Sequence, residues 1–323
     1  MSRVELRDYR AEVDTTRELV ADARAGLTAS PKWLPPKWFY DARGSDLFER
    51  ITELPEYYQT RAEYRILERY APDIAERTGV DSLVELGSGS SSKTVLLLDA
   101  LRKNGTLERF VPSDVSHAAL RGALSRLSVD YPEVDLHAVV GDFETTLEVL
   151  PRANTRMIAL LGGTIGNMDP WQRDRFLRQV RGALDGGEWL LLGTDLVKDP
   201  ERLRRAYDDG EGVTAEFNRN VLHVLNRGLG ADFPVEEFVH CARYDGRRER
   251  VEISLRSPRA MRVWLDEAAL AVELSAGEEI ETEISAKFRY SGVRTELHEA
   301  GFELIDWYTD RDRDFAVALA RAS

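Results

Sequence analysis

The feature that most constrains the fold is a regular alternation of amphipathic helical segments and short apolar strands between about residues 60 and 197. Strands separated by helices usually pair in parallel, because each helix returns the chain to the same edge of the sheet. The alternation therefore predicts an α/β fold with a doubly wound, mostly parallel sheet. Helices are expected over 61–77, 92–102, 116–127 and 169–184, and strands at 82–86, 110–112, 136–140, 157–161 and 189–192.

A different pattern begins after residue 199. Two expected helices, over 200–208 and 214–227, precede strands on either side of Asp245 and Gly246, a pair that favours a tight hairpin turn. A helix and two strands after residue 292 are expected to complete the first sheet. We therefore expect two domains: a core made of 60–197 plus 287–323, and an inserted α+β substrate-binding domain made of 1–59 plus 198–286.

Charge and composition argue against several kinds of partner. The 44 basic and 57 acidic residues give a net charge of −13 without a basic run, which argues against nucleic acid and anionic membranes. No apolar stretch is long enough to cross a bilayer and the N-terminus lacks a signal-peptide pattern, so we expect a cytoplasmic protein. The single cysteine, Cys241, and the five histidines show no metal-ligand spacing, and we expect no metal.

The sequence VELGSGSSSK, residues 84–93, places a glycine loop between an expected strand and an expected helix. Gly87 and Gly89 allow the backbone to approach a ligand closely, and the start of the helix offers unpaired N–H groups. Ser92 replaces the third glycine of a dinucleotide fingerprint, and the ending of a P-loop is missing. With Glu85 at the strand end, the loop favours a nucleoside without a pyrophosphate; a tight turn without a ligand is the alternative.

Two further acidic residues follow the next two strands. Asp114 ends the second strand, where its carboxylate can accept hydrogen bonds from both ribose hydroxyls. Asp142 ends the third, where it can accept from an adenine amino group, with Phe143 near the ring. The alternatives are a helix N-cap for Asp114 and an ordinary turn residue for Asp142. Because the carboxyl ends of parallel strands meet at one edge, the spacing favours a single nucleoside site.

Two polar residues extend the expected site along this edge. Lys93 is expected in the first turn of a helix, where the helix dipole disfavours a cation, and this suggests that its ammonium meets a carboxylate. Asn167 ends the sequence LGGTIGN, residues 161–167, after the fourth strand, where ligands bind in open α/β sheets. The alternative is that its amide only stabilises a loop.

Several longer segments, in order over nearly the whole chain, have a further pattern in common. They are PPKWFYDARGSDLFERITELPEYYQTRAE, VELGSGSSSK, GDF, LGGTIGN, LLLGTDLVKD, AYDD, VTAEFNRN and TEISAKFR. Together they resemble the histidine-specific Nα-methyltransferases of ergothioneine biosynthesis. The resemblance implies a Rossmann-like class I methyltransferase core, S-adenosylmethionine as the methyl donor and free L-histidine as the substrate.

The resemblance also implies a role for each site residue. S-adenosylmethionine would be bound by Gly87, Lys93, Asp114, Asp142 and Phe143. The remaining roles concern the substrate: Asn167 and Tyr207 for its carboxylate, Tyr57, Glu283 and Ser285 for its imidazole, and Tyr40 with the Gly162 carbonyl for its amine. Glu283 and Ser285 are two apart and share a face on a strand. Without the resemblance, TEISAKFR would be interpreted as a solvated edge strand.

Two positions depart from the family pattern: Gly163 stands in place of a serine and Ile253 in place of a methionine. Both concern the shape of the substrate pocket, and hence the discrimination against tryptophan and tyrosine. Of the adjacent Tyr57 and Tyr58, the motif position favours Tyr57. A methyltransferase for another amino acid is one alternative function, and a non-catalytic module that senses a nucleoside is another. Because the pocket is expected within one chain, we expect a monomer.

Overall fold

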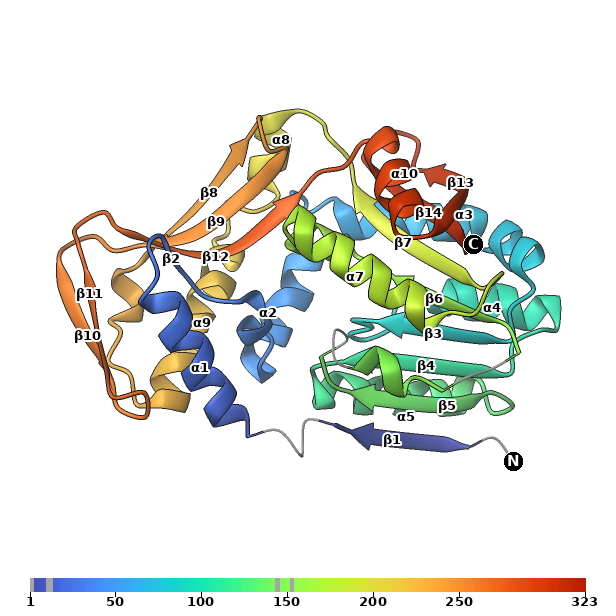
Figure 1. Ribbon diagram of the computed structural model, residues 1–323, viewed down its shortest axis with the longest axis horizontal. Helices are drawn as coiled ribbons and strands as arrows, with labels where there is room; N and C mark the ends of the chain where they lie inside the picture. Colours follow the sequence, from blue (N-terminus) through green and yellow to red (C-terminus); the bar gives the residue numbers. More distant parts are fainter. Residues whose placement is uncertain (1–2, 10–13, 143–145, 152–153) are drawn as a thin grey trace. The chain divides into compact units, whose positions relative to one another are not determined.

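The computed structural model describes residues 3–9, 14–142, 146–151 and 154–323, which form two compact units (Figure 1). Unit 1 consists of Met1–Tyr9, Gln59–Val197 and Ala286–Ser323, and unit 2 of Arg10–Tyr58 and Lys198–Ser285. The start of the chain differs from our expectation, which assigned the whole N-terminal arm to the inserted domain. Here Val4–Asp8 forms a strand, β1, which pairs in parallel with residues 136–140 of the large sheet.

The described strands of unit 1 form one eight-stranded sheet: β1, β3 (Ser82–Leu86), β4 (Arg109–Asp114), β5 (Asp135–Val140), β6 (Arg156–Leu160), β7 (Trp189–Asp195), β13 (Phe302–Thr309) and β14 (Phe315–Ala322). Their order is β1-β5-β4-β3-β6-β7-β14-β13. The pairings from β1 to β7 are parallel, whereas β14 is antiparallel to both β7 and β13. Because the chain runs outward from β3 on one side and from β6 on the other, the topological switch point lies between them.

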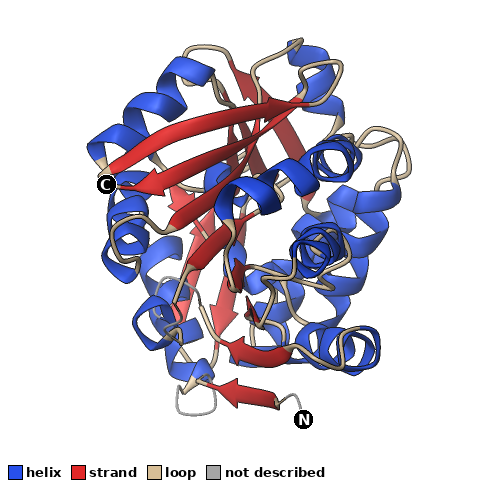
Figure 2. Ribbon diagram, turned by 90° about the vertical axis from the view of Figure 1, so that its right-hand side faces the viewer, coloured by secondary structure: helices blue, strands red, loops and turns tan. Residues whose placement is uncertain are grey.

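Helices of unit 1 cover both faces of this sheet (Figures 1 and 2): α3 (Gln59–Thr78), α4 (Val95–Asn104), α5 (His117–Asp130), α7 (Pro170–Ala183) and α10 (Tyr290–Glu299). Successive residues of a strand point to opposite faces, and β6 illustrates the division. Met157 and Ala159 pack in an apolar cluster with α3, α4 and α5. Ile158 and Leu160 pack in a second cluster with α7 and α10. All four side chains are fully buried, which explains why β6 is apolar after Arg156.

Local sequence signals define where two of these helices begin. Asp169 and Gln172 form a capping box at the start of α7, at the position where the helix 169–184 was expected to begin. The N-cap of α5 is Ser116, whose hydroxyl accepts the N–H of Ala119 at 3.3 Å. Asp114 therefore is not the N-cap of α5, and that alternative for Asp114 is wrong.

Helices of unit 2 surround a separate apolar core: α1 (Thr15–Leu27), η1 (Pro36–Phe39), α2 (Ala42–Glu53), α9 (Val213–Leu229) and η4 (Val235–Glu237). Another helix, α8 (Pro200–Arg205), packs through Leu203 in a smaller cluster with Tyr58 and Tyr207. The apolar face of α9 contributes Phe217, Val221 and Leu225, which recur at helical spacing and are buried. They belong to the same cluster as Leu19 of α1 and Ile51 of α2. The N-terminal segment is thereby packed onto a helix that lies far along the chain (Figure 1).

The strands of unit 2 form a four-stranded sheet of order β2-β12-β9-β8 and a separate hairpin. The bounds are β2 (Lys32–Trp33), β8 (Val239–Asp245), β9 (Arg250–Arg256), β10 (Met261–Leu265), β11 (Leu270–Leu274) and β12 (Glu279–Ala286). The expected hairpin joins β8 to β9, but Asp245 pairs with Arg250, so the loop 246–249 is longer than the tight turn that we expected. β12 lies between β2 and β9 in the sheet, but β2 pairs only with Ile280 and Glu281, so TEISAKFR begins beyond the part of β12 that β2 covers.

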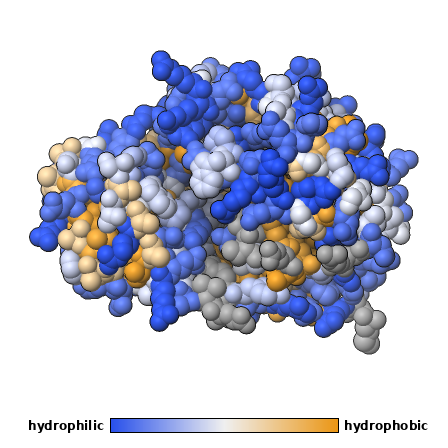
Figure 3. All heavy atoms as spheres, viewed as in Figure 1, coloured by the Kyte–Doolittle hydropathy of each residue, from blue (hydrophilic) through white to orange (hydrophobic). Residues whose placement is uncertain are grey.

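Hydrophilic side chains cover most of the face seen in Figure 3, as the large number of charged residues requires. Hydrophobic side chains gather on this face over β10 and β11. No described helix has both the length and the apolar character needed to cross a membrane.

Candidate active site

The glycine loop after β3 is tied to the end of the neighbouring strand β4. Gly87 and Gly89 have φ angles of 67° and 50°, in the left-handed region that favours glycine. The N–H of Gly89 donates to Oδ2 of Asp114 at 2.8 Å, and the N–H of Ser116 donates to Oδ1 at 2.8 Å. Burial nevertheless raises the pKa of Asp114, although these two N–H groups favour the ionised form. One carboxylate thus links two strand ends at the switch-point edge.

Glu85, on β3, is buried and close to this loop. The Thr94 hydroxyl donates to its Oε1 at 2.5 Å, and within the described part of the chain its Oε2 has no hydrogen-bond partner. Burial raises the pKa of the Glu85 carboxyl to about 8, because an ionised group there would be desolvated and incompletely paired. The acidic strand end is therefore a carboxyl that holds its proton at neutral pH.

This raised pKa predicts a pH-dependent stability. The folded protein keeps the Glu85 proton that the unfolded chain loses near pH 4.5, so this contribution is full below pH 4.5 and disappears as the pH rises to about 8. Between pH 5 and pH 8, the free energy of unfolding of the wild type should fall relative to that of Glu85→Gln, by up to about 4 kcal/mol. Urea unfolding of both proteins at each pH measures this. An equal difference at the two pH values would contradict it.

The end of β5 carries the third predicted acidic residue. Asp142 is half-buried, and its carbonyl accepts the N–H of Thr146 at 3.0 Å. A Cβ on Gly141 would lie 2.5 Å from Cγ2 of Thr146, so this turn requires glycine. Phe143 lies outside the described residues, and its predicted contact with an adenine ring stays a prediction.

The loop after β6 contacts a residue that the sequence analysis missed. Gly162 and Gly163 have φ angles of 77° and 74°, which explains why glycine suits position 163. The N–H of Gly162 donates to both carboxylate oxygens of Glu63, at 2.8 and 3.0 Å. Lys93 forms an ion pair with the same carboxylate. A charged residue on the apolar face of the expected helix 61–77 was the signal that could have identified Glu63.

The position of Lys93 therefore corrects one expectation. α4 begins at Val95, so Lys93 precedes the helix rather than lying in its first turn. The carboxylate that it meets belongs to Glu63, on α3. Its ammonium still has donors for a second acceptor, because a lysine carries three N–H groups.

Asn167 lies at the end of a short 3-10 helix, η3 (Thr164–Asn167), which follows this loop. The preceding residue, Gly166, packs against the backbone of Ala286, where a Cβ would lie 2.9 Å from the carbonyl oxygen. The segment beyond Ala286 is held to the sheet by a buried ion pair between Lys287 and Asp195, with Nζ and Oδ2 2.8 Å apart. In addition, the N–H of Phe288 donates to the Asp195 carbonyl at 2.8 Å. These contacts fix the loop that carries Asn167 against the end of β7.

In unit 2, the predicted substrate residues belong to a row of aromatic rings. Tyr40 contacts Phe48 with ring centroids 5.7 Å apart, and Phe48 contacts Tyr57 at 6.2 Å. Tyr57 contacts Tyr207 at 6.3 Å, and each pair is edge-to-face, the arrangement that aromatic rings prefer. The neighbouring Tyr58 instead accepts a hydrogen bond from Lys198 at 2.6 Å. The two adjacent tyrosines therefore have different environments, and only Tyr57 joins this row.

The last ring of the row is fixed by two hydrogen bonds. The Tyr207 hydroxyl and the Ser285 hydroxyl on β12 are 2.7 Å apart. His240 Nε2 lies 2.8 Å from the Tyr207 carbonyl, which can only accept, so this nitrogen carries the proton. Nδ1 of His240 then accepts from the Asn218 amide at 2.9 Å, and burial lowers the pKa of this imidazole. A neutral histidine thus supports Tyr207, while Glu283 shares the face of β12 with Ser285.

The structure therefore brings the predicted residues together in two sets, one in each unit. The set of unit 1 lies at the carboxyl ends of β3, β4, β5 and β6: Gly87, Lys93, Asp114, Asp142, Gly162 and Asn167. The set of unit 2 combines the aromatic row with β12: Tyr40, Tyr57, Tyr207, Glu283 and Ser285.

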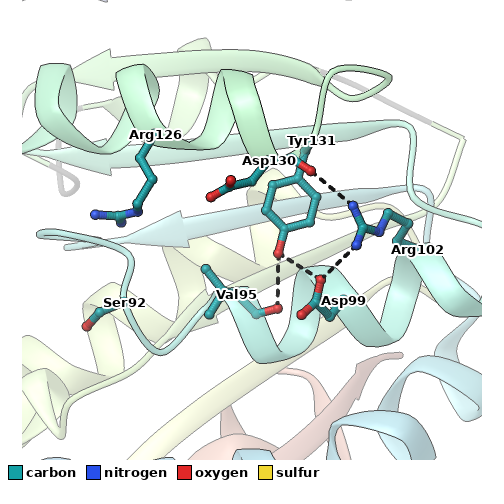
Figure 4. Close-up of a pocket in the computed structure, with 7 residues that line it drawn as sticks. All are labelled: Ser92, Val95, Asp99, Arg102, Arg126, Asp130 and Tyr131. Carbon is teal, nitrogen blue, oxygen red and sulfur yellow. Dashed lines mark hydrogen bonds and ion pairs between the residues drawn. The ribbon is translucent and has the colours of Figure 1, made fainter.

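A hollow of about 540 Å³ lies near the glycine loop, between α4 and α5 (Figure 4). Figure 4 shows the Tyr131 hydroxyl directed at Asp99, to which it donates at 2.9 Å. Arg102 lies over the Tyr131 ring, 4.8 Å from its centroid. Tyr131, Asp99 and Arg102 therefore interact with one another. The lining of the hollow contains none of the predicted ligand residues, so we assign no ligand to it.

Among the residues that the structure describes, one group of carboxylates has the spacing of a metal site. The carboxylate oxygens of Asp310, Asp312 and Asp314 lie within 4.8 Å of one another. Asp310 accepts the N–H groups of Asp314 and Phe315, both at 2.8 Å, so its burial is explained by the turn before β14. We assign no metal to this group.

A parallel sheet with this strand order, an antiparallel β14 beside β7 and a glycine loop after β3 define a class I S-adenosylmethionine-dependent methyltransferase. The chain belongs to the family of S-adenosylmethionine-dependent, histidine-specific methyltransferases, which it matches over residues 19–322.

Three relatives illustrate this membership. The histidine N-alpha-methyltransferase of Mycolicibacterium smegmatis is 50% identical, over 98% of each chain. The protein of the same name from Mycobacterium tuberculosis is 49% identical, over 98% of this chain and 99% of its own. Ergothioneine biosynthesis protein 1 of Schizosaccharomyces pombe is 34% identical over 66% of this chain, a match that covers 29% of the yeast protein.

Proposed function

We propose that this chain transfers methyl groups from S-adenosylmethionine to the α-amine of L-histidine, and that three transfers give the betaine hercynine for ergothioneine biosynthesis. One observation carries the proposal. About half of the residues are identical to those of two relatives named histidine N-alpha-methyltransferase, and both matches extend over nearly the full length of each chain. The fungal relative named for ergothioneine biosynthesis supports the pathway.

The residues of unit 1 fit a bound S-adenosylmethionine. Gly87 and Gly89 have no heavy atom within 4 Å of an added Cβ among their described neighbours, so their backbone can be approached closely. We propose that Asp114 accepts from the ribose and Asp142 from the adenine, with Phe143 beside the ring, and that Lys93 meets the methionine carboxylate. When bound, the donor supplies a methyl group on a positively charged sulfur.

The remaining predicted residues are assigned to the substrate by their chemistry. We assign the histidine carboxylate to Asn167 and Tyr207, since an amide and a phenol can donate to it. The imidazole is assigned to Tyr57, Glu283 and Ser285, because a carboxylate and a hydroxyl can serve both the N–H and the acceptor nitrogen of the ring. The two edge-to-face contacts of Tyr57 support this choice over Tyr58.

The reaction requires no nucleophile from the protein, because the amine of the substrate attacks the methyl carbon directly. The chain must align the amine, exclude water and allow the ammonium to lose a proton before each transfer. We propose that the Tyr40 hydroxyl and the Gly162 carbonyl orient the amine, and that Tyr40 passes its proton towards solvent. The faces of Tyr40 and Phe48 would accommodate the cation as it gains methyl groups.

Product analysis tests the proposal. The purified protein is incubated with L-histidine and excess S-adenosylmethionine, and the products are followed by mass spectrometry. We expect hercynine together with three equivalents of S-adenosylhomocysteine. Monomethylhistidine as the end product would refute trimethylation. Turnover of tryptophan but not of histidine would show a methyltransferase with a different substrate. No turnover of either amino acid would favour the non-catalytic module that senses a nucleoside.

We also propose that the protein acts as a cytoplasmic monomer without a metal. The net charge of −13 supports a solvent-exposed surface, and each assigned substrate or cofactor contact comes from this one chain. Light scattering of the purified protein would test whether it is a monomer, and a metal analysis would test whether it lacks a metal.

A further inference from the structure

Glu63 is a buried carboxylate in an otherwise apolar environment. Its side chain has no exposed surface, and its neighbours on the same face of α3, among them Ile66 and Leu67, belong to the main apolar cluster of unit 1. A carboxylate is costly to bury unless it is paired and hydrogen-bonded. Its presence therefore needs an explanation in terms of what it binds.

The contacts of Glu63 join two loops of the candidate site. One oxygen forms an ion pair with Lys93, in the loop after β3, and both oxygens accept the N–H of Gly162, in the loop after β6. These two strands flank the topological switch point, where ligands bind in sheets of this kind. The lysine and the glycine backbone also lie close together, since a Cβ on Gly162 would be 3.8 Å from Nζ of Lys93.

A third strand end encloses the same carboxylate. A Cβ on Gly193 of β7 would lie 2.3 Å from Oε1 of Glu63, so the backbone of β7 comes as close as a glycine allows. Glu63 is therefore enclosed by the ends of β3, β6 and β7. Small displacements of this carboxylate would be transmitted to Lys93 and to Gly162 together, because the interior leaves little space to absorb them.

We propose that Glu63 is a positioning residue for methyl transfer. Its carboxylate orients the ammonium of Lys93 towards the methionine carboxylate of the donor, and it fixes the peptide that leads to the Gly162 carbonyl facing the substrate amine. One side chain would thus set the relative position of the donor and the acceptor. The inference rests on the proposed function, because it assigns the ligands of Lys93 and Gly162 from it.

The test compares Glu63→Gln with the wild type and with Lys93→Met. Glutamine keeps the shape of the side chain but cannot form the ion pair or accept at both oxygens. We expect Glu63→Gln to raise the KM for S-adenosylmethionine and also to lower kcat at least tenfold, because both the lysine and the glycine peptide shift. Lys93→Met should mainly raise this KM, since it removes a contact made before and during the transfer.

Glu188→Gln is the matched control. Glu188 is a buried glutamate of the same unit that pairs with Arg156 at 2.8 Å, but it lies at the amino ends of β6 and β7, away from the site. The Glu188→Gln variant should be less stable than the wild type, but its kcat and KM should be unchanged. If Glu63→Gln behaved in the same way, with lower stability but wild-type constants for the folded protein, Glu63 would be merely structural and the inference would be wrong.

Two measurements keep the outcome decisive. If Glu63→Gln does not fold, Glu63→Asp replaces it in the test. Aspartate retains the charge but is shorter by one methylene, and this variant should show the same changes in KM and kcat. Wild-type values would refute the inference.

Calorimetric binding of S-adenosylhomocysteine reports on Lys93 without turnover, and Glu63→Gln should bind it at least tenfold more weakly. A wild type that methylates no histidine would refute the proposed function instead, whereas equal binding by both proteins would refute the inference alone.

Discussion

Replacing Glu283 by alanine should lower kcat/KM for L-histidine by about 100-fold or more, because a site built to hydrogen-bond a polar ring loses much of its affinity when one partner is removed. Glu283 lies on β12 on the same face as Ser285, whose hydroxyl is already paired with Tyr207 at 2.7 Å. The proposed contact is to the imidazole and not to the reacting amine, so most of the loss should appear in the KM for histidine rather than in kcat. Steady-state kinetics with varied histidine measures both.

The control for this substitution is Glu273→Ala, which removes an exposed glutamate from β11 in the same unit. It should leave both constants unchanged. Glu283→Ala should also narrow the preference for histidine over tryptophan, because the lost carboxylate is the proposed acceptor for the imidazole N–H. A variant with wild-type kcat/KM for histidine would show that Glu283 does not contact the ring.

Replacing Lys287 by methionine should destabilise the protein by about 3–5 kcal/mol, since it leaves the Asp195 carboxylate buried without its cation. The Lys287 side chain is fully buried and that of Asp195 is 3% exposed, with 2.8 Å between Nζ and Oδ2. The pair fixes the segment after β12 against the end of β7. Urea unfolding followed by circular dichroism gives the change in free energy.

Two further variants separate this effect from a general sensitivity to lost charges. The double variant Lys287→Met with Asp195→Leu should recover much of the stability, because no buried charge is then left unpaired. Arg204→Met removes the surface ion pairs of Arg204 with Glu201 and Asp208, and should cost less than about 1 kcal/mol. If Lys287→Met cost no more than Arg204→Met, the buried pair would not stabilise the fold.

The features that the sequence predicted well are those that depend on local signals. The strand Ser82–Leu86 has the predicted bounds because it carries three apolar residues, Leu83, Val84 and Leu86, and Gly87 follows it. The start of α7 follows from Asp169 and Gln172, which cap the helix through their own side chains. The members of the candidate site at the strand ends could be predicted for the same reason, since the position of a residue after a parallel strand determines the edge at which it lies.

The features that were missed depend on contacts between distant segments. Val4–Asp8 looks like an ordinary polar arm, and it becomes a strand only because β5 offers a free edge far along the chain. The partner of Lys93 is Glu63, thirty residues earlier, and neither residue indicates the other locally. The place of β12 between β2 and β9 depends on strands that are distant in the sequence, and the alternating polarity of TEISAKFR indicates neither partner.

Selective recognition of histidine is tested most directly by calorimetry. L-histidine, L-tryptophan and L-tyrosine are titrated into the wild-type protein saturated with S-adenosylhomocysteine. We expect histidine to bind at least tenfold more tightly than the other two, because its two ring nitrogens suit the proposed contacts with Glu283 and Ser285. The indole of tryptophan offers a donor but no acceptor, and tyrosine has both functions on one oxygen at the far end of a larger ring. Equal or tighter binding of tryptophan or tyrosine, or no binding of histidine, would contradict a histidine site built from these residues.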